Sequence, residues 1–386
     1  MPTPANIPAI ALPLLHDDDH LDWSSLLHRR TAPADPISLA GPFAGKRILI
    51  TGAAGSIGSA LAKCIALLQP EHLTLLDSAE HGLYELQNDL ASLRGAAPCT
   101  LVPGNICDGG LLRELLAAHR PHIVYHAAAY KHVPLMEHHP LAALETNALG
   151  TYSLAKASIE SHVEQFIMLS TDKAVSPSSI MGASKRAAEL VLLALQDHAP
   201  RMKALRLGNV LGSRGSVVPL FQSQIARGGP VTVTDPQVRR YFLPLRESVE
   251  FLLSLAHAQY LDGIFIPDIG EPIRILDLAH FLISNAAPAN SIGITFTGLR
   301  PGDKMQEQLL SASESIDSHT SGSLLHKVTS STPPANCTLD TIQQLQQAIR
   351  QRAVGAALQT LQRIVPEYQP SDIVRHNVSH SVIAHE

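Results

Sequence analysis

Short apolar runs alternate with amphipathic stretches through the middle of the chain. From residue 46 onward, the runs KRILIT, LTLLD, CTLVPG, HIVYHAA, QFIMLS and MKALRLGNV are separated by stretches such as SALAKCIALL and GLLRELLAAHR, whose apolar residues recur at helical spacing. Strands this apolar are best buried on both faces. The pattern therefore predicts an α/β protein with a doubly wound parallel sheet, helices on either side and right-handed connections.

The same pattern divides the chain into four parts. Residues 1–43 form a Pro-rich arm that we expect to be poorly ordered, and residues 44–210 hold the alternating units. Over residues 211–310 the rhythm loosens, which predicts a smaller α+β substrate-binding cap. Residues 311–386 begin with a Ser/Thr-rich stretch, expected to be a long loop up to about residue 337, and continue with two short helices.

Composition narrows the class of protein. A chain of 386 residues can bury one large core or two coupled ones, and its net charge of −5 gives no general reason to bind nucleic acid. Four cysteines without paired spacing favour a reducing compartment, so we predict a cytoplasmic protein. No apolar run approaches the roughly 20 residues of a transmembrane segment, and the start of the chain lacks the pattern of a secretory signal.

A glycine-rich turn, ILITGAAGSIGSAL, follows the first predicted strand and opens the first helix. Gly52, Gly55 and Gly58 allow a tight turn, close approach to a pyrophosphate and close helix packing, and Ser56 and Ile57 lie in the same turn. Glycines also collect at helix starts for packing alone. Their position between a strand and a helix favours a Rossmann-type dinucleotide site.

Asp77 supports the same interpretation. It ends the second predicted strand, where a carboxylate accepts hydrogen bonds from an adenosine ribose, although a helix cap or turn would also explain it. No Arg or Lys follows in DSAEHG, so NAD is favoured and NADP stays possible. The remaining predicted cofactor contacts are Asn105 and Ile106 in GNICD, and Ala127 and Ala128 after the fourth strand.

Several further motifs share their spacing with a known family. TGAAGSIG, HAAAYKHVPLMEHHPLAALETNALGT, LSTDKAVSPSSIMGASK, LRLGNVLGSRGSVVPLF and GLRPGDK resemble the extended short-chain dehydrogenase/reductases. Within them, the chain resembles the UDP-N-acetylglucosamine 4,6-dehydratases of capsular and O-antigen polysaccharide biosynthesis, from about residue 22 to 371. Many relatives carry an N-terminal membrane domain ahead of this part, and we expect this chain to lack it.

This resemblance implies a reaction on a UDP-linked N-acetylhexosamine, with NAD as the cofactor. Hydride leaves C4, water is eliminated across C5 and C6, and the hydride returns to C6 to give a 4-keto-6-deoxy sugar. Such an enzyme needs a base for the 4-hydroxyl, a base for the C5 proton and an acid for the departing 6-hydroxyl.

The resemblance assigns the elimination to Asp172 and Lys173, with the aspartate as acid at O6 and the lysine as the C5 base. Lys185 would hold the nicotinamide ribose and supply the nearby cation that helps Lys173 to act as a base. Alternatively, Asp172 and Lys173 form a surface pair in a loop, and Lys185 is a solvated helix residue.

Met181 departs from the usual pattern, in which a tyrosine stands four residues before the lysine. The departure resembles the membrane-anchored branch of these dehydratases, which carries methionine here and resembles the C5-retaining enzymes. The 4-hydroxyl proton must then go to Asp172, to Thr171 through a water, or to Ser170, and we favour Asp172 acting twice. Alternatively, Met181 fills an apolar gap in an inactive protein.

Substrate contacts follow from the same resemblance. Two arginines are expected to grip the UDP diphosphate, because a planar guanidinium suits phosphate oxygens, although each is also explained as a surface charge. Arg239 is a less favoured neighbour. The predicted substrate-binding residues are Lys131, Asn209, Arg214, Ser216, Arg240 and Arg300.

Twenty histidines and the cluster HDDDH suggest a metal site at first sight. We predict none, because the central histidines lie in family motifs that work without metal, and HDDDH falls in the N-terminal arm. We expect a homo-oligomer. Three functions remain open, namely a 4,6-dehydratase, a nucleotide-sugar 4-epimerase, and a noncatalytic protein that binds NAD and a UDP-sugar.

Overall fold

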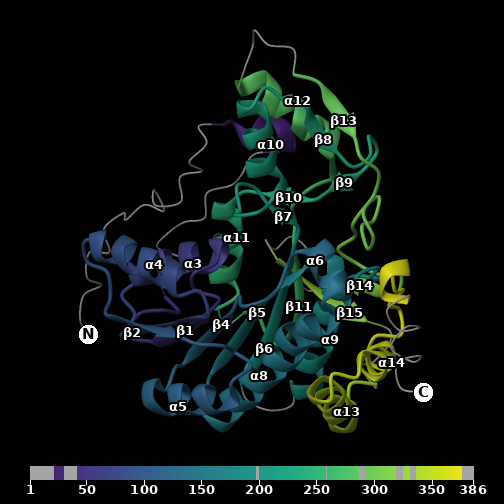
Figure 1. Ribbon diagram of the computed structural model, residues 1–386. Helices are drawn as coiled ribbons and strands as arrows, with labels where there is room; N and C mark the ends of the chain where they lie inside the picture. The colour runs from purple at the N-terminus through teal and green to yellow at the C-terminus, as the bar shows by residue number, and fades with distance from the viewer. Residues whose placement is uncertain are drawn as a thin grey trace.

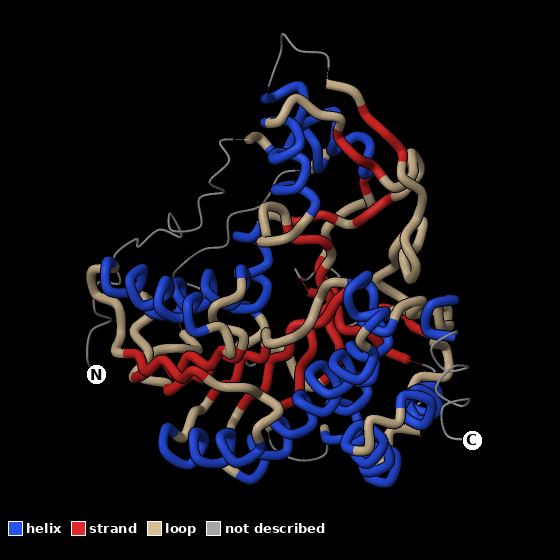
Figure 2. Tube along the Cα trace, in the orientation of Figure 1, coloured by secondary structure: helices blue, strands red, loops and turns tan. Residues whose placement is uncertain are grey.

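A nine-stranded sheet forms the centre of the molecule (Figures 1 and 2). The computed structural model describes residues 21–29, 41–196, 200–257, 259–286, 292–318, 325–330 and 336–375. Seven neighbouring strands are parallel, and the two at one edge are antiparallel. In spatial order the strands are β14 (Glu314–Ile316), β15 (Leu325–Ser330), β11 (Gly263–Pro267), β6 (Arg201–Leu207), β5 (Gln165–Thr171), β4 (Ile123–His126), β1 (Arg47–Thr51), β2 (His72–Asp77) and β3 (Cys99–Pro103).

Helices cover both faces of this sheet, which confirms the predicted doubly wound Rossmann-type fold (Figure 1). The chain order reverses between β1 and β4, which makes the carboxyl ends of these strands the expected ligand crevice. One face carries α3 (Ser56–Ala66), α4 (Glu80–Ser92) and α11 (Leu245–Ser254), and the other carries α5 (Gly109–His119), α8 (Thr151–Glu160) and α9 (Ile180–Leu195).

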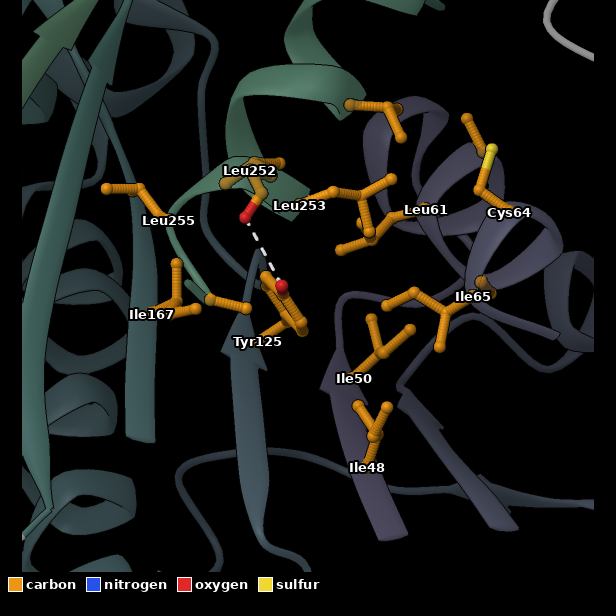
Figure 3. Close-up of a cluster of buried hydrophobic side chains, with 14 of the residues drawn as sticks. Ile48, Ile50, Leu61, Cys64, Ile65, Tyr125, Ile167, Leu252, Leu253 and Leu255 are labelled. Carbon is orange, nitrogen blue, oxygen red and sulfur yellow. Dashed lines mark hydrogen bonds between the residues drawn. The ribbon is translucent and has the colours of Figure 1, made fainter. Parts of the chain in front are cut away.

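The apolar runs form strands because their side chains are buried in a core beneath α3 and α11. Ile48 and Ile50 of β1 lie fully buried against Leu61 of α3 (Figure 3). The phenol of Tyr125, also buried in this core, donates a hydrogen bond of 3.2 Å to the carbonyl of Leu252 in α11. A polar atom inside this core therefore has its partner, as burial requires.

A smaller α+β cap stands beyond one end of the sheet strands, as predicted (Figure 1). Two elements inside the predicted cap range lie outside the cap: β11 is a strand of the central sheet, and α11 packs on one face of that sheet. The cap elements are β7 (Asn209–Val210) with β10 (Phe242–Leu243), α10 (Val217–Ala226), β8 (Val231–Val233) with β13 (Ile294–Phe296), β9 (Arg239–Arg240) with β12 (Ile273–Arg274), and α12 (Ile275–Ala286).

The described residues depart from two expectations about order. Residues 21–29 contain α1 (Trp23–Leu27), which packs on the cap with the ring of Trp23 centred 5.4 Å from that of Phe281. Residues 1–20 and 30–40 lie outside the described part, and HDDDH with them. The Ser/Thr-rich stretch supplies β14 and β15, because the exposed edge of β11 pairs with β15, for example at Ile264 and Val328.

The C-terminal part has the two predicted helices, α13 (Leu339–Arg350) and α14 (Val354–Ile364). Both bury apolar side chains in a cluster that also includes residues of α9. None of the helices in the described ranges is long and apolar enough to cross a membrane.

Candidate active site

The glycine-rich turn packs directly on the end of β4. Gly52 has a φ of +69°, and a Cβ there would lie 2.5 Å from the nitrogen of Ala128 and 2.6 Å from the carbonyl carbon of Ala127. A Cβ on Gly58 would meet the Gly52 carbonyl oxygen. Gly55 caps α3, which begins at Ser56. The turn therefore presents the N-terminus of an 11-residue helix beside β1 and β4, which suits a pyrophosphate.

Asp77 holds this turn in place. Its Oδ2 accepts a hydrogen bond of 2.9 Å from the nitrogen of Ala54, and its Oδ1 accepts one of the same length from Ala79. Each oxygen can accept a further bond, so a ribose contact is compatible with this geometry. Asn105 accepts from the nitrogen of Cys107, and Ile106 is buried.

The predicted elimination pair lies where β5 ends. Asp172 is fully buried, so the alternative of a surface pair does not hold. Its Oδ1 accepts from the Thr171 hydroxyl at 2.9 Å and from Lys173 Nζ at 3.0 Å. Lys173 Nζ also donates to Asn209 Oδ1 at 3.0 Å. Within the described residues, Asp172 Oδ2 has no hydrogen-bond partner, which leaves a buried acceptor for a ligand or water.

Lys185 and Met181 face different surroundings on α9. Lys185 is only 5% exposed and donates to the carbonyl of Leu169 at 2.7 Å, and burial lowers its pKa to about 8. Met181 is buried in an apolar cluster with Val133 and Ala148. The contacts of Met181 are those of a packing residue, and a thioether has no proton to give or take.

His126 is a buried residue that sequence analysis did not assign. Burial and, secondarily, the nearby Lys185 lower its pKa to about 3, so it is neutral. Its ring nitrogens lie 2.7 Å from the Thr51 hydroxyl and 2.9 Å from the Thr151 hydroxyl. These contacts tie β1, β4 and α8 together beneath the glycine-rich turn.

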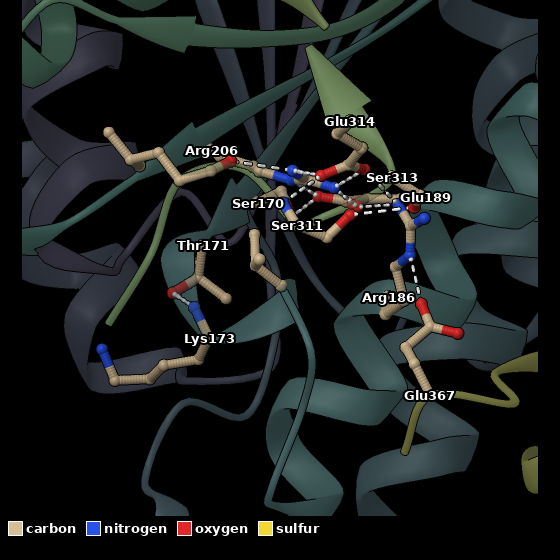
Figure 4. A network of polar contacts seen from close by, with 12 residues as sticks. Ser170, Thr171, Lys173, Arg186, Glu189, Arg206, Ser311, Ser313, Glu314 and Glu367 are labelled. Atoms are coloured by element: carbon tan, nitrogen blue, oxygen red, sulfur yellow. Dashed lines mark hydrogen bonds and ion pairs between the residues drawn. The ribbon is translucent and has the colours of Figure 1, made fainter. Parts of the chain in front are cut away.

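Ser170 belongs to a buried ionic network (Figure 4). Its hydroxyl donates to Glu189 Oε1 at 2.7 Å, so this hydroxyl proton is already engaged by a carboxylate. Arg206 binds both oxygens of Glu189, at 2.9 and 2.8 Å, and pairs with Glu314 at 2.8 Å. Burial alone would raise the pKa of Glu189, but Arg206 and Arg186 bring it down to about 2.

Sequence analysis missed this network because Glu189, Arg206 and Glu314 lie far apart in the chain and come together only in the fold. Only its position, one helical turn after Lys185, marks Glu189 as a residue of interest. Asn147 was missed for the same reason. Its side chain accepts from the nitrogen of Tyr130 at 2.8 Å and donates to the Ser184 hydroxyl at 2.9 Å, which fixes the loop after β4 on α9.

The predicted substrate residues divide into two groups. Asn209 contacts the elimination pair, and Arg240 on β9 is only 7% exposed, with its Nη1 donating to the carbonyl of Arg239 at 2.7 Å. Lys131 Nζ donates to the carbonyl of Arg214 at 2.7 Å, which joins two predicted loops.

The other predicted residues lie at the margin. The Arg214 side chain is 71% exposed and pairs with Glu85 at 3.0 Å, and Arg300 pairs with Asp303 at 2.9 Å. Ser216 precedes α10, and its hydroxyl oxygen is buried without a partner among the described residues. Across the described ranges, no group of three or more His, Cys, Asp or Glu side chains is placed to hold a metal ion.

The Rossmann-type sheet and the glycine-rich turn place the protein in a class: it has the fold of the short-chain dehydrogenase/reductases that act on nucleotide sugars. More specifically, the profile of the polysaccharide biosynthesis protein family matches residues 48–328. The chain therefore belongs to this family, and the predicted resemblance is confirmed.

Relatives of this chain differ in their described activities. The capsular polysaccharide biosynthesis protein CapD of Staphylococcus aureus is 41% identical over 299 residues, covering 76% of this chain and 50% of CapD. An inverting UDP-N-acetylglucosamine 4,6-dehydratase of Campylobacter jejuni is 34% identical, covering 71% of this chain and 80% of that protein. A UDP-glucose 4-epimerase of Rickettsia rickettsii is 33% identical, covering 70% and 80%.

Solved structures agree on the fold. The crystal structure of Pen from Bacillus thuringiensis superposes with a TM-score of 0.66 at 28% identity, covering 69% of this chain and 83% of Pen. The chain spans about half the length of CapD and of EpsC from Bacillus subtilis, which it also matches.

Proposed function

We propose that the protein is an NAD-dependent 4,6-dehydratase that converts UDP-N-acetylglucosamine to a UDP-4-keto-6-deoxy-N-acetylhexosamine for polysaccharide biosynthesis. The observation that carries the proposal is the Asp172–Lys173 pair at the end of β5, in which Asp172 is fully buried and its Oδ2 is unpartnered among the described residues. An acid and a base side by side are what elimination across C5 and C6 requires.

The residues around the turn fit the cofactor. A Cβ at Gly52 or Gly58 would collide with neighbouring backbone, so only glycine allows the tight turn on which a pyrophosphate would lie. Asp77 lies beside this turn, and Lys185 lies on α9. When bound, NAD accepts a hydride from C4 of the sugar and supplies it to C6. NAD is favoured over NADP because the segment after Asp77 has no cation for a 2′-phosphate.

One carboxylate can balance the protons. Asp172 takes the proton of the 4-hydroxyl and later gives it to the departing 6-hydroxyl, so the proton leaves with the water. Lys173 takes the C5 proton and returns it when C6 accepts the hydride. Thr171 donates a hydrogen bond to Asp172 and orients it, so that no tyrosine at residue 181 is needed.

A nucleotide-sugar 4-epimerase is the second candidate, because a relative with that description is 33% identical. Epimerisation returns the hydride to C4 and needs a proton shuttle there, without an acid for O6. Met181 has no proton to shuttle, and the acid–base pair would be superfluous. Both features favour the dehydratase. The cytoplasmic location and the homo-oligomer remain predictions.

The test is incubation of the purified protein with UDP-N-acetylglucosamine and NAD, followed by mass spectrometry and NMR. Loss of one water with a new C6 methyl signal is the expected result. Unchanged mass with a 4-epimer in the NMR spectrum would overturn the proposal in favour of the epimerase. Untouched substrate that still binds would indicate a noncatalytic protein.

Lys173→Ala should abolish water loss while NAD and UDP-sugar binding, measured by calorimetry, stay near those of the unchanged protein. The variant removes the proposed C5 base and leaves the glycine-rich turn and Arg240 intact. Lys63→Ala, on the surface of α3, is the matched control and should retain activity. Retained dehydration in Lys173→Ala would contradict the assigned role.

A further inference from the structure

Residues 300–307, which we call the clasp segment, join the cap to the loop that follows β5. Lys304 Nζ donates to the carbonyl of Val175 at 2.7 Å, three residues after Asp172, and the Ser178 hydroxyl donates to the carbonyl of Gly302 at 2.9 Å. On the other side, the nitrogen of Arg239 donates to the carbonyl of Met305 at 2.8 Å. The clasp segment therefore contacts both the elimination loop and β9.

Glu307 brings a buried carboxylate to this junction. The residue is 3% exposed, and its Oε2 forms an ion pair of 3.1 Å with Lys304 Nζ. Burial would raise its pKa, but Lys173, Lys304 and Arg240 together lower it. The contacts agree with this: Lys304, which pairs with Glu307, is anchored to Val175, two residues after Lys173, and Arg240 Nη1 donates to the carbonyl of Met305 at 3.3 Å, two residues before Glu307. Glu307 is therefore an anion placed between the elimination loop and Arg240.

Ion pairing alone does not explain why Glu307 lies close to Lys173, because each of the two residues already has its own partner. Lys304, which is also anchored to Val175, is enough to balance one buried carboxylate. Lys173 already has Asp172 as its own partner at 3.0 Å. A second anion near Lys173 matters if Lys173 changes its charge during the reaction, because a nearby carboxylate favours the ammonium over the neutral amine.

We propose that Glu307 is a positioning residue for Lys173. Its fixed negative charge stabilises the ammonium that forms when Lys173 removes the C5 proton. Glu307 lies in the clasp segment, which also contacts β9, the strand of Arg240. The proposal rests on the proposed dehydratase function for the role of Lys173. The effect of Glu307 on the charge of Lys173 can be measured in the absence of substrate, whether or not the protein is a dehydratase.

The experiment is competitive labelling of the full chain with trace acetic anhydride over a range of pH, with each lysine followed by peptide mass spectrometry. In Glu307→Gln, the labelling curve of Lys173 should move to lower pH, with a severalfold faster reaction at neutral pH, because the ammonium loses a stabilising anion. The curve of Lys63 should not move. An unchanged Lys173 curve in folded Glu307→Gln would overturn the proposal.

Two further variants separate position from net charge and guard against misfolding. Gln308→Glu added to Glu307→Gln restores the net charge at an exposed neighbouring residue, and should leave the Lys173 curve shifted. Lys304→Met removes the cation that shares Glu307 and should move the Lys173 curve to higher pH. Restoration by Gln308→Glu, or no shift in Lys304→Met, would contradict the proposal.

Turnover then tests the link to catalysis. If the unchanged protein dehydrates the substrate, the rise of kcat with pH should occur at lower pH in Glu307→Gln, while NAD binding stays the same. A general loss of structure would lower kcat at all pH values without moving the profile. If the unchanged protein does not dehydrate the substrate, the proposed function fails, and the labelling result still decides whether Glu307 governs Lys173.

Discussion

At the scale of single residues, the cofactor turn depends on the absence of side-chain atoms. Gly52 combines a left-handed φ with backbone atoms of Ala127 and Ala128 in the space of its missing Cβ. Gly95 has a similar φ of +81° but nothing within 4 Å of the corresponding position. A substitution at Gly95 would therefore introduce backbone strain alone, whereas the same substitution at Gly52 would introduce both backbone strain and a steric clash.

Gly95→Ala should lower the free energy of unfolding by about 1–2 kcal/mol, the cost of a left-handed alanine. Gly52→Ala should cost about 1–3 kcal/mol more, because the added methyl group must displace backbone, and it should abolish NAD binding. Urea unfolding and calorimetric titration with NAD measure the two effects. Equal costs, with NAD binding retained in both variants, would show that the turn tolerates a Cβ.

At the scale of elements, α9 holds the site together. It is buried along most of its length and carries Met181, Lys185 and Glu189. Glu189 connects it to β5 through Ser170 and to β6 through Arg206, which is fully buried. A buried charge network of this kind fixes the relative position of three elements more than it adds stability.

Arg206→Met should lower the free energy of unfolding by about 3–5 kcal/mol, because it leaves Glu189 and Glu314 buried without their main partner. Lys63→Met, which breaks a partly exposed pair with Asp89, should cost only about 0–1 kcal/mol. Denaturant unfolding of both variants at neutral pH is the measurement. Similar small costs would mean that the network contributes little.

At the scale of the whole molecule, one buried lysine makes stability depend on pH. Lys203 is fully buried, and its Nζ donates to Gln165 Oε1 at 2.8 Å and to the carbonyl of Leu255 at 2.6 Å. Burial, aided by Arg201, lowers its pKa from 10.5 to about 7. The folded state thus holds fewer protons than the unfolded state between these two values, so this group adds stability as the pH rises.

The free energy of unfolding of the unchanged protein, minus that of Lys203→Met, should therefore increase from pH 7 to pH 9. The difference removes the titration of all other groups, and comparing it at two pH values also removes the constant cost of leaving the carbonyl of Leu255 without its donor. Urea unfolding of the unchanged protein and of Lys203→Met, each at pH 7 and pH 9, gives the free energies that are compared. A difference that stays constant would mean that Lys203 keeps its proton in the folded state.

Sequence alone was sufficient for the sheet, the dinucleotide turn and the order of the motifs. The reason is that these features are local: apolar runs, a glycine triplet after a strand, and Asp172–Lys173 as neighbours in the chain. The predicted long loop failed where β15 pairs with β11, because an unpaired sheet edge recruits a strand whatever its own composition.

Tertiary structure alone decided which charges act together. Glu307 lies 134 residues from Lys173 in the chain, and Arg206 reaches Glu314 across 108 residues, so no local pattern could pair them. The sequence marked both Arg214 and Asp172 as site residues, yet the fold exposes the first and buries the second. Burial and the distances between charged atoms are properties of the packed chain, and they determine which of the marked residues can do chemistry.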